Sequence, residues 1–168
     1  QRLSTPCTAA ANGGDRSGHS VASAGDVDGD GLSDLLIGAP YHDDGPEVDA
    51  GKSYLLFGAS LLLGGSFELS QADASFVGEN SRDTSGFTVS SAGDVDADGL
   101  DDLLIGAPGF HSSFSNQVGI SYLWLGSTVS SGGNFGLGAS SVRLAQDYYR
   151  GHSGRAVSSA GDVHGDGF

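Results

Sequence analysis

Two nine-residue stretches place carboxylates at the spacing of a cation-binding loop. Residues 26–34 are Asp-Val-Asp-Gly-Asp-Gly-Leu-Ser-Asp, and residues 94–102 are Asp-Val-Asp-Ala-Asp-Gly-Leu-Asp-Asp. Aspartates stand at positions 1, 3, 5 and 9 of both, so that alternate side chains of a tightly turning loop can point at one centre. Glycine at position 6 permits the sharp turn, where a Cβ would clash. The chemistry indicated is coordination of a hard divalent cation by oxygen atoms.

Calcium fits this set of ligands better than other metals. Many oxygen ligands in a flexible arrangement favour calcium over magnesium, and both loops lack the thiols and imidazoles that suit zinc or copper. The alternative, a solvated acidic turn without metal, leaves four like charges to repel one another. We therefore predict at least two calcium sites, with the carbonyl groups of the two leucines as ligands: Asp26, Asp28, Asp30, Leu32 and Asp34 in the first, and Asp94, Asp96, Asp98, Leu100 and Asp102 in the second.

These loops differ from an EF-hand. Position 12 is Ile37 or Ile105, inside an apolar run, where an EF-hand has a bidentate glutamate. The fourth carboxylate comes at position 9 instead, where the next strand is expected to begin. The ion should therefore hold together a strand–loop–strand hairpin.

A third loop, at residues 162–168, is incomplete. Asp162, His164 and Asp166 occupy positions 1, 3 and 5, and position 9 lies beyond the sequence. Because a histidine nitrogen is a poor calcium ligand, this loop is only a weak candidate for a metal site. We expect it to keep its shape without an ion.

An internal repeat of 68 residues organises the chain. Ser-Ala-Gly-Asp-Val occurs at residues 23–27, 91–95 and 159–163, and Leu-Leu-Ile-Gly-Ala-Pro occurs at 35–40 and 103–108. A repeat unit generally buries its face only against its neighbours. We expect a segment of a longer protein, or one that assembles with other chains. The predicted boundaries within residues 1–168 are the end of a preceding blade at 1–17, repeat 1 at about 18–85, repeat 2 at about 86–153, and a truncated repeat 3 at 154–168.

Each repeat has the pattern of β-strands separated by Gly, Pro and Asp. Three strands per repeat are clear, and they fall at 20–23, 34–38 and 53–57, then at 88–91, 102–106 and 121–125. A fourth lies either at 67–69 and 135–137 or near 75–77 and 142–144. Four radially repeated strands in each unit predict an all-β fold, a partial β-propeller of about two and a half repeats with four-stranded antiparallel blades. A β-solenoid is the alternative.

Composition excludes some partners. The net charge of −14 argues against nucleic acid and against an anionic membrane surface. No apolar run approaches the roughly 18 residues of a membrane span, so we expect no membrane insertion. Cys7 is the single cysteine, and it is either a free thiol or paired outside this sequence.

The residues resemble a known family. Ser85-Gly86-Phe87 and Gly106-Ala107-Pro108, with the acidic loop between them, are similar to the FG-GAP repeat of integrin α-subunit propellers. The first repeat has His19 and the third has Arg155 where the second has Phe87. The resemblance implies a seven-bladed propeller with calcium in the hairpin loops, away from the ligand face. It also implies an extracellular setting and a role in adhesion or ligand recognition.

No catalytic arrangement is evident in the sequence. None of the five histidines has a nucleophile partner at a recognisable spacing, and they are His19, His42, His111, His152 and His164. We interpret His19 as a packed structural residue, His42 and His111 as surface residues, and Trp124 as part of the core. Loops 41–50 and 109–118 differ most between the repeats, and we expect partner contacts there.

The resulting hypothesis is a calcium-binding extracellular or cell-surface propeller, not itself an enzyme, with a structural, adhesion or recognition role. Its expected partners are a protein or glycan ligand and the remaining blades or other subunits. Related repeats also occur in bacterial surface proteins, in lectin-like propellers and beside the catalytic domain of a phospholipase. An accessory propeller of a secreted hydrolase and a glycan-binding propeller are therefore the alternatives.

Overall fold

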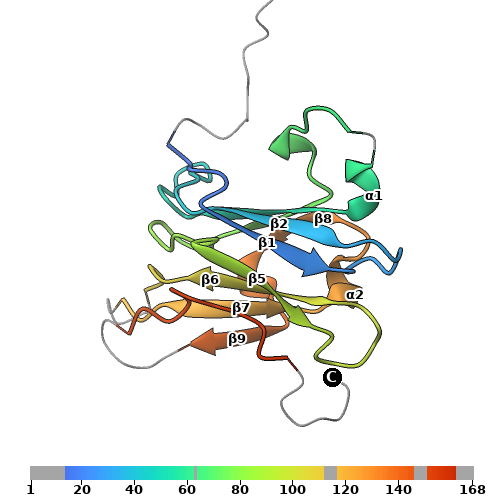
Figure 1. Ribbon diagram of the computed structural model, residues 1–168. Coiled ribbons are helices and arrows are strands. Elements are labelled where there is room, and N and C mark those ends of the chain that lie inside the picture. Colours follow the sequence, from blue (N-terminus) through green and yellow to red (C-terminus); the bar gives the residue numbers. More distant parts are fainter. Residues whose placement is uncertain (1–13, 63, 112–116, 146–150, 162–168) are drawn as a thin grey trace, which may run out of the picture.

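A computed structural model describes residues 14–62, 64–111, 117–145 and 151–161. The described residues form two β-sheets that lie one above the other (Figure 1). The strand order is β1–β2–β3–β4–β8 in one sheet and β5–β6–β7–β9 in the other. Each repeat thus supplies four strands of one sheet, as the propeller interpretation requires, and the all-β prediction is confirmed.

The first four strands of the upper sheet are antiparallel neighbours, and the lower sheet repeats them. The bounds are β1 (Ser20–Gly25), β2 (Asp34–Ala39), β3 (Lys52–Leu56) and β4 (Ala74–Val77), then β5 (Thr88–Gly93), β6 (Asp102–Ala107), β7 (Ile120–Trp124) and β9 (Val142–Ala145). The register repeats as well, since Ile37 faces Tyr54 and Ile105 faces Tyr122. The three clear strands per repeat are confirmed.

The fourth strand of each repeat lies at the second of the two predicted places, near 75–77 and 142–144. It is β4 in the first repeat and β9 in the second. Leu69 instead begins a short 3-10 helix, η1 (Leu69–Gln71), so the alternative at 67–69 is wrong. At the corresponding place in the second repeat, β8 (Gly133–Gly136) does form a strand, but it pairs in parallel with β4 of the first repeat. The first blade therefore has five strands.

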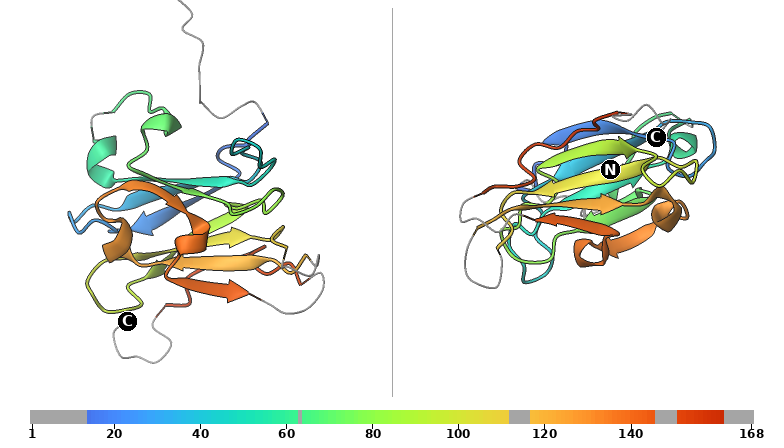
Figure 2. Two further views of the ribbon diagram at one scale, coloured as in Figure 1. Left: turned by 180° about the vertical axis from the view of Figure 1, so that it is seen from behind. Right: turned by 90° about the horizontal axis from the view of Figure 1, so that it is seen from below.

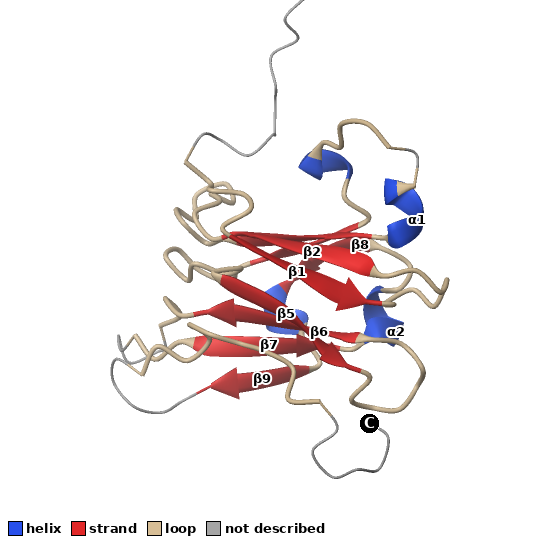
Figure 3. Ribbon diagram, viewed as in Figure 1, coloured by secondary structure: helices blue, strands red, loops and turns tan. Residues whose placement is uncertain are grey.

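Helical structure in the described residues is confined to short turns after the third strand of each repeat (Figure 3). These are α1 (Gly58–Leu61) and η1 in the first repeat, and α2 (Gly126–Val129) and η2 (Leu137–Ala139) in the second. No helix in this part of the chain has the length and apolar character needed to cross a membrane.

The core lies between the two sheets. Trp124 is buried, and its ring centroid lies 5.3 Å from that of Phe76 and 5.2 Å from that of Phe135. Phe76 and Phe135 are themselves stacked with centroids 5.5 Å apart. The prediction that Trp124 packs in the core is confirmed, and its neighbours come from both repeats.

Close backbone contact between repeats explains the glycine of each Gly-Ala-Pro motif. A Cβ on Gly38 would collide with the carbonyl oxygen of Gly86, and a Cβ on Gly106 with that of Gly154. The hydroxyl of Ser20 donates a hydrogen bond to the Gly86 oxygen at 3.0 Å. The glycines of these motifs thus let consecutive repeats approach one another.

Candidate metal centre

Both acidic loops lie where the sequence predicts, between the first two strands of each repeat. β1 pairs antiparallel with β2, and β5 with β6, so each loop closes a hairpin. The two turns lie at the end of the sheets that also holds α1 and α2 (Figure 2). The loops that join β2 to β3 and β6 to β7 must lie at the opposite end, because antiparallel strands reverse direction at each turn.

The first loop gathers three carboxylates. One oxygen from each of Asp26, Asp28 and Asp30 lies within 4.8 Å of the others. The loop is held by its own backbone: Asp26 accepts hydrogen bonds from the amides of Gly29 and Gly31 at 2.9 and 3.0 Å. These bonds fold the loop back on position 1 and leave the other oxygens grouped around one centre.

The second loop gathers a different three of its four predicted carboxylates. Oxygens of Asp94, Asp96 and Asp102 lie within 4.8 Å of one another. Asp94 accepts hydrogen bonds from the amides of Asp98 and Gly99 at 3.1 and 2.9 Å, much as Asp26 does in the first loop. Each loop thus clusters three of its four predicted carboxylates: Asp34 is outside the first cluster and Asp98 is outside the second. The full ligand set remains a prediction.

Position 9 is buried and already hydrogen-bonded. Asp34 accepts from the amides of Val27 and Gly58, both at 2.8 Å, and Asp102 accepts from those of Val95 and Gly126 at the same distance. Burial raises the pKa of both carboxyl groups, and the nearby loop aspartates raise it further, while these amide bonds lower it. A cation bound beside these groups would favour their charged form.

The residues fit calcium by the chemistry of their donors. Each loop offers clustered carboxylate oxygens with unused lone pairs, and it holds no nitrogen or sulfur ligand. The like charges lack a counter-charge inside the loops, which a divalent cation would supply. Ligation by the Leu32 and Leu100 carbonyls remains a prediction. The weak third candidate, with Asp162, His164 and Asp166, lies outside the described residues, as does Cys7.

A residue that sequence reasoning did not single out connects the two loops. The amide of Asp26 donates to the Asp101 carboxylate at 2.8 Å, and the amide of Asp101 donates to the Asp26 carbonyl at 3.0 Å. The first repeat has Ser33 at the corresponding position, and this difference between repeats was the available signal. The metal candidates are therefore adjacent and mechanically linked.

The described histidines have structural neighbours. The ring of His19 lies 4.7 Å from that of Phe87, but the residue is exposed, so it makes an aromatic contact at the surface and is not the packed residue that the sequence predicts. His42 is more than a surface residue, because its Nδ1 lies 2.8 Å from Oδ2 of buried Asp15. His111 is exposed, and it forms an isolated antiparallel β-bridge with Gln117.

Asp83 corresponds to Asp15 but has a different environment. It is buried, and its Oδ2 accepts from the Asn80 amide at 2.9 Å. In the described part of the chain its Oδ1 accepts no hydrogen bond. The pKa of Asp83 is raised to about 6: burial is the main cause and the charge of Glu79 adds to it, while hydrogen bonds from Asn80 and the charge of His111 oppose it.

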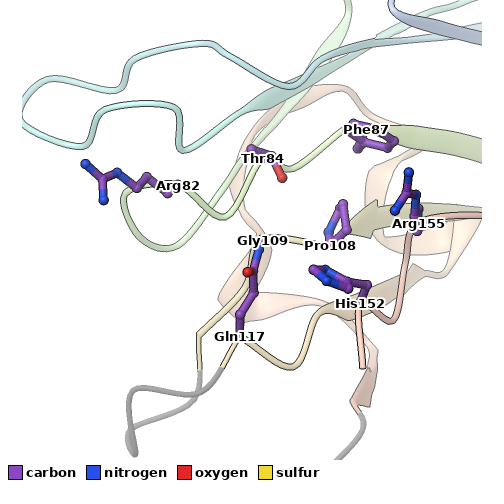
Figure 4. Close-up of a pocket in the computed structure, with 8 residues that line it drawn as sticks. All are labelled: Arg82, Thr84, Phe87, Pro108, Gly109, Gln117, His152 and Arg155. Carbon is purple, nitrogen blue, oxygen red and sulfur yellow. The ribbon is translucent and has the colours of Figure 1, made fainter. Parts of the chain in front are cut away.

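A pocket of about 380 Å³ opens near the end opposite the acidic loops (Figure 4). One of its lining residues, Gly109, stands where the first repeat has Tyr41, whose ring lies 4.6 Å from the Arg16 guanidinium. Basic and polar side chains line the hollow, including those of Arg82, His152 and Arg155. Figure 4 shows Arg82 extending away from the other two, so the charges do not converge on one point.

Comparison with known families agrees with this geometry. A model of the FG-GAP repeat matches residues 17–56 and 85–124, two segments that are 68 residues apart. Both repeats of the sequence thus match this family model over part of their length. Each match runs from the turn before the first strand, through the acidic loop, to the third strand.

Similar curated proteins are integrin alpha subunits. The chain is 40% identical to integrin alpha-PS2 of Drosophila melanogaster over 101 residues, which are 56% of this chain and 7% of that protein. It is 39% identical to integrin alpha-4 of Xenopus laevis over 87 residues, and 34% identical to integrin alpha-3 of Mus musculus over 98 residues. Those matches cover 51% and 54% of this chain and 8% of each relative. The chain thus spans less than a tenth of the length of these relatives.

Proposed function

We propose that this chain is part of an extracellular, calcium-stabilised FG-GAP propeller with an integrin-like role in adhesion or ligand recognition. The observation that carries the proposal is the clustering of three carboxylates in each of two equivalent hairpins. Similarity to integrin alpha subunits supports recognition over catalysis. The hydrolase-accessory and lectin alternatives have no observation of their own in their favour.

Calcium would act as a structural clamp. The proposed ligands in the first loop are the Leu32 carbonyl and the carboxylates of Asp26, Asp28, Asp30 and Asp34. The proposed ligands in the second loop are the counterparts Asp94, Asp96, Asp98, Leu100 and Asp102. The ion would supply the positive charge that the loops lack, and thereby hold each β-hairpin closed. Binding at a hundredfold excess over the dissociation constant stabilises a fold by about 2.7 kcal/mol per site. Millimolar extracellular calcium suffices for sites of modest affinity.

Recognition would occur at the opposite end. Loops 41–50 and 109–118 leave the same strand pairs on the side away from the acidic turns, and their sequences diverge while the strands do not. Residues 112–116 lie outside the described part of the chain. A protein or glycan ligand would contact these loops, and further blades or subunits would complete the propeller.

Thermal unfolding with and without calcium tests the proposal. The melting temperature should rise with added calcium and fall on chelation, and Asp98→Ala should remove much of the response because it deletes a ligand of the second loop. Asp44→Asn is the matched control: it removes an exposed acidic charge outside both loops and should leave the calcium response intact. An unchanged melting temperature on chelation would contradict the proposal.

Magnesium provides a second arm of the same experiment. Magnesium requires near-ideal octahedral geometry at shorter distances than calcium, so the flexible loops should respond to it weakly. Equal stabilisation by the two ions at equal concentration would count against the assigned coordination.

A further inference from the structure

The two acidic loops contact each other through a pair of reciprocal hydrogen bonds. The amide of Asp26 donates to Oδ2 of Asp101 at 2.8 Å, and the amide of Asp101 donates to the Asp26 carbonyl at 3.0 Å. Asp26 is position 1 of the first loop, and Asp101 is position 8 of the second. Both main-chain polar groups of a proposed metal ligand are therefore bound to a residue of the other repeat.

Close packing surrounds these hydrogen bonds. A Cβ on Gly25, the residue before Asp26, would collide with the carboxylate of Asp101. A Cβ on Gly29 would lie 2.9 Å from the Cδ2 atom of Leu100. Gly25 and Gly29 also have φ angles of 80° and 77°, which glycine adopts without strain. The first loop therefore cannot shift toward the second unless Leu100 or Asp101 moves as well.

Asp101 stands between two proposed ligands of the second loop. Its neighbours in the chain are Leu100, whose carbonyl is a proposed ligand, and Asp102, whose carboxylate belongs to the second cluster. The amide of Leu100 donates to Oδ1 of Asp98 at 2.9 Å, and Asp102 accepts hydrogen bonds from two amides. A cation held by these groups would restrain residues 98–102, and with them the main chain of Asp101.

Asp26 in turn organises the first loop. Its carboxylate accepts hydrogen bonds from the amides of Gly29 and Gly31 at 2.9 and 3.0 Å, and one of its oxygens belongs to the first cluster. The direction of that carboxylate depends on the main-chain conformation of Asp26, which the two bonds to Asp101 restrain. Ordering of the second loop therefore also orders position 1 of the first.

This arrangement favours positive coupling between the loops. A ligand that binds to an already ordered site loses less conformational entropy than one that must order the site itself. The shared hydrogen bonds need both loops in their folded shape, so binding in one loop lowers the cost of ordering the other. Neutralising one loop also weakens the attraction of the other for a cation. That opposing effect is screened by salt, because the Debye length is about 8 Å at about 0.15 M ionic strength.

We propose that Asp101 couples the two loops, so that calcium bound in either one raises the calcium affinity of the other. The inference rests on the proposed function, because it requires calcium in both loops. Coupling between two sites typically changes affinity by about 5- to 150-fold, and it is equal in both directions. Two hydrogen bonds form the connection here, so we expect a factor at the low end, about five to ten. Asp101 is a positioning residue in this account and not a metal ligand.

Calcium titrations of matched variants measure the coupling. Asp28→Ala and Asp96→Ala each remove position 3 of one loop, and both residues lie in the clusters. These two variants give the affinity of each loop when the other is empty. The product of the two affinities in the wild-type chain, divided by the product of the two single-site affinities, is the coupling factor. Calorimetric titration at about 0.15 M salt supplies the affinities, and the amide NMR signals of Gly31 and Gly99 report which loop is filled.

Substitutions at position 8 then show whether Asp101 carries the coupling. The same three titrations with Asp101→Ser, which installs the residue of the first loop, should give a factor near one. Asp101→Asn keeps an oxygen that can accept from the Asp26 amide and should retain most of the coupling. Ser33→Ala changes the exposed position 8 of the first loop and should leave the factor unchanged. Circular dichroism checks that each variant is folded before titration, and the wild-type factor tests the proposal without any change at Asp101.

The outcomes separate this inference from the proposed function. Two ions that bind the wild-type chain independently, or that weaken each other, would overturn the coupling and leave the proposed function intact. Coupling that persists in Asp101→Ser would also overturn the inference. Its loss in Asp101→Asn would do the same, since the charge of Asp101 and not its hydrogen bonds would then carry the effect. Absence of calcium binding in both loops would refute the proposed function and this inference together.

Discussion

The two repeats have nearly the same strands in the same register, yet corresponding residues are buried to different extents. Leu137 and Val129 of the second repeat are fully buried, while Leu69 and Leu61 of the first are partly exposed. The second repeat packs these residues against the first, and no described segment does the same for the first. Burial here is therefore a property of the junction between repeats more than of a single repeat, as in other repeat architectures.

Leucine truncation at two equivalent positions tests this difference most strongly. Leu137→Ala should lower the free energy of unfolding by about 3 kcal/mol, because it opens a cavity in the junction. Leu69→Ala removes the same atoms from a partly exposed site and should cost about 1 kcal/mol or less. Urea unfolding at low protein concentration measures both. Equal losses would show that each repeat is stabilised internally.

Asp83 and Asp15 are buried at equivalent positions of the two repeats. Replacing each with asparagine should change the free energy of unfolding in opposite directions. Because the pKa of Asp83 is raised to about 6 in the folded chain, the folded state holds a proton between about pH 4 and 6 that the unfolded state releases. This contribution to stability is therefore lost as pH rises through 6. Asp83→Asn should stabilise the chain at pH 8 by about 2 kcal/mol, and the gain should shrink toward pH 5.

Asp15→Asn is the comparison for that prediction. Asp15 lies 2.8 Å from His42, so the substitution weakens a charge-assisted contact and should destabilise the chain by about 1 kcal/mol at pH 7. Both variants are melted across pH 5–8 in the same calcium concentration. A difference between wild type and Asp83→Asn that does not change with pH would refute the assignment.

The link between the acidic loops should have a smaller effect. Asp101→Ser installs the residue of the first repeat and removes the carboxylate that accepts from the Asp26 amide at 2.8 Å. The expected cost is about 1.5 kcal/mol, typical of a hydrogen bond to a charged group. Ser33→Ala is the control, since Ser33 is exposed, and should be neutral. Equal melting temperatures for Asp101→Ser and wild type would sink this account of the link.

Much of this architecture follows from local sequence. The 68-residue spacing, the apolar runs and the glycines at fixed offsets predict the sheets and the hairpin loops, because strand patterning and turn chemistry act over a few residues. The carboxylate spacing in residues 26–34 and 94–102 likewise predicts that aspartates cluster in each loop, although only three of the four predicted carboxylates gather in either one. Comparison of the repeats also placed Trp124 in the core, since Leu56 is its counterpart.

What sequence could not supply are contacts between repeats. The sequence offers a strand at 135–137 only as one alternative, because β8 is rich in glycine, and its pairing with β4 depends on the free edge that β4 presents. The Asp26–Asp101 link and the Asp15–His42 contact depend on segments brought together by folding, so no local pattern marks them. The unsatisfied environment of Asp83 likewise depends on what surrounds it in space.

Equilibrium dialysis against calcium, with the bound metal measured by atomic emission, tests the central claim most directly. The account predicts two saturable ions per wild-type chain, one in either Asp30→Ala or Asp98→Ala, and none in the double variant. Absence of saturable binding in the folded wild-type chain, or two ions retained by the double variant, would contradict it.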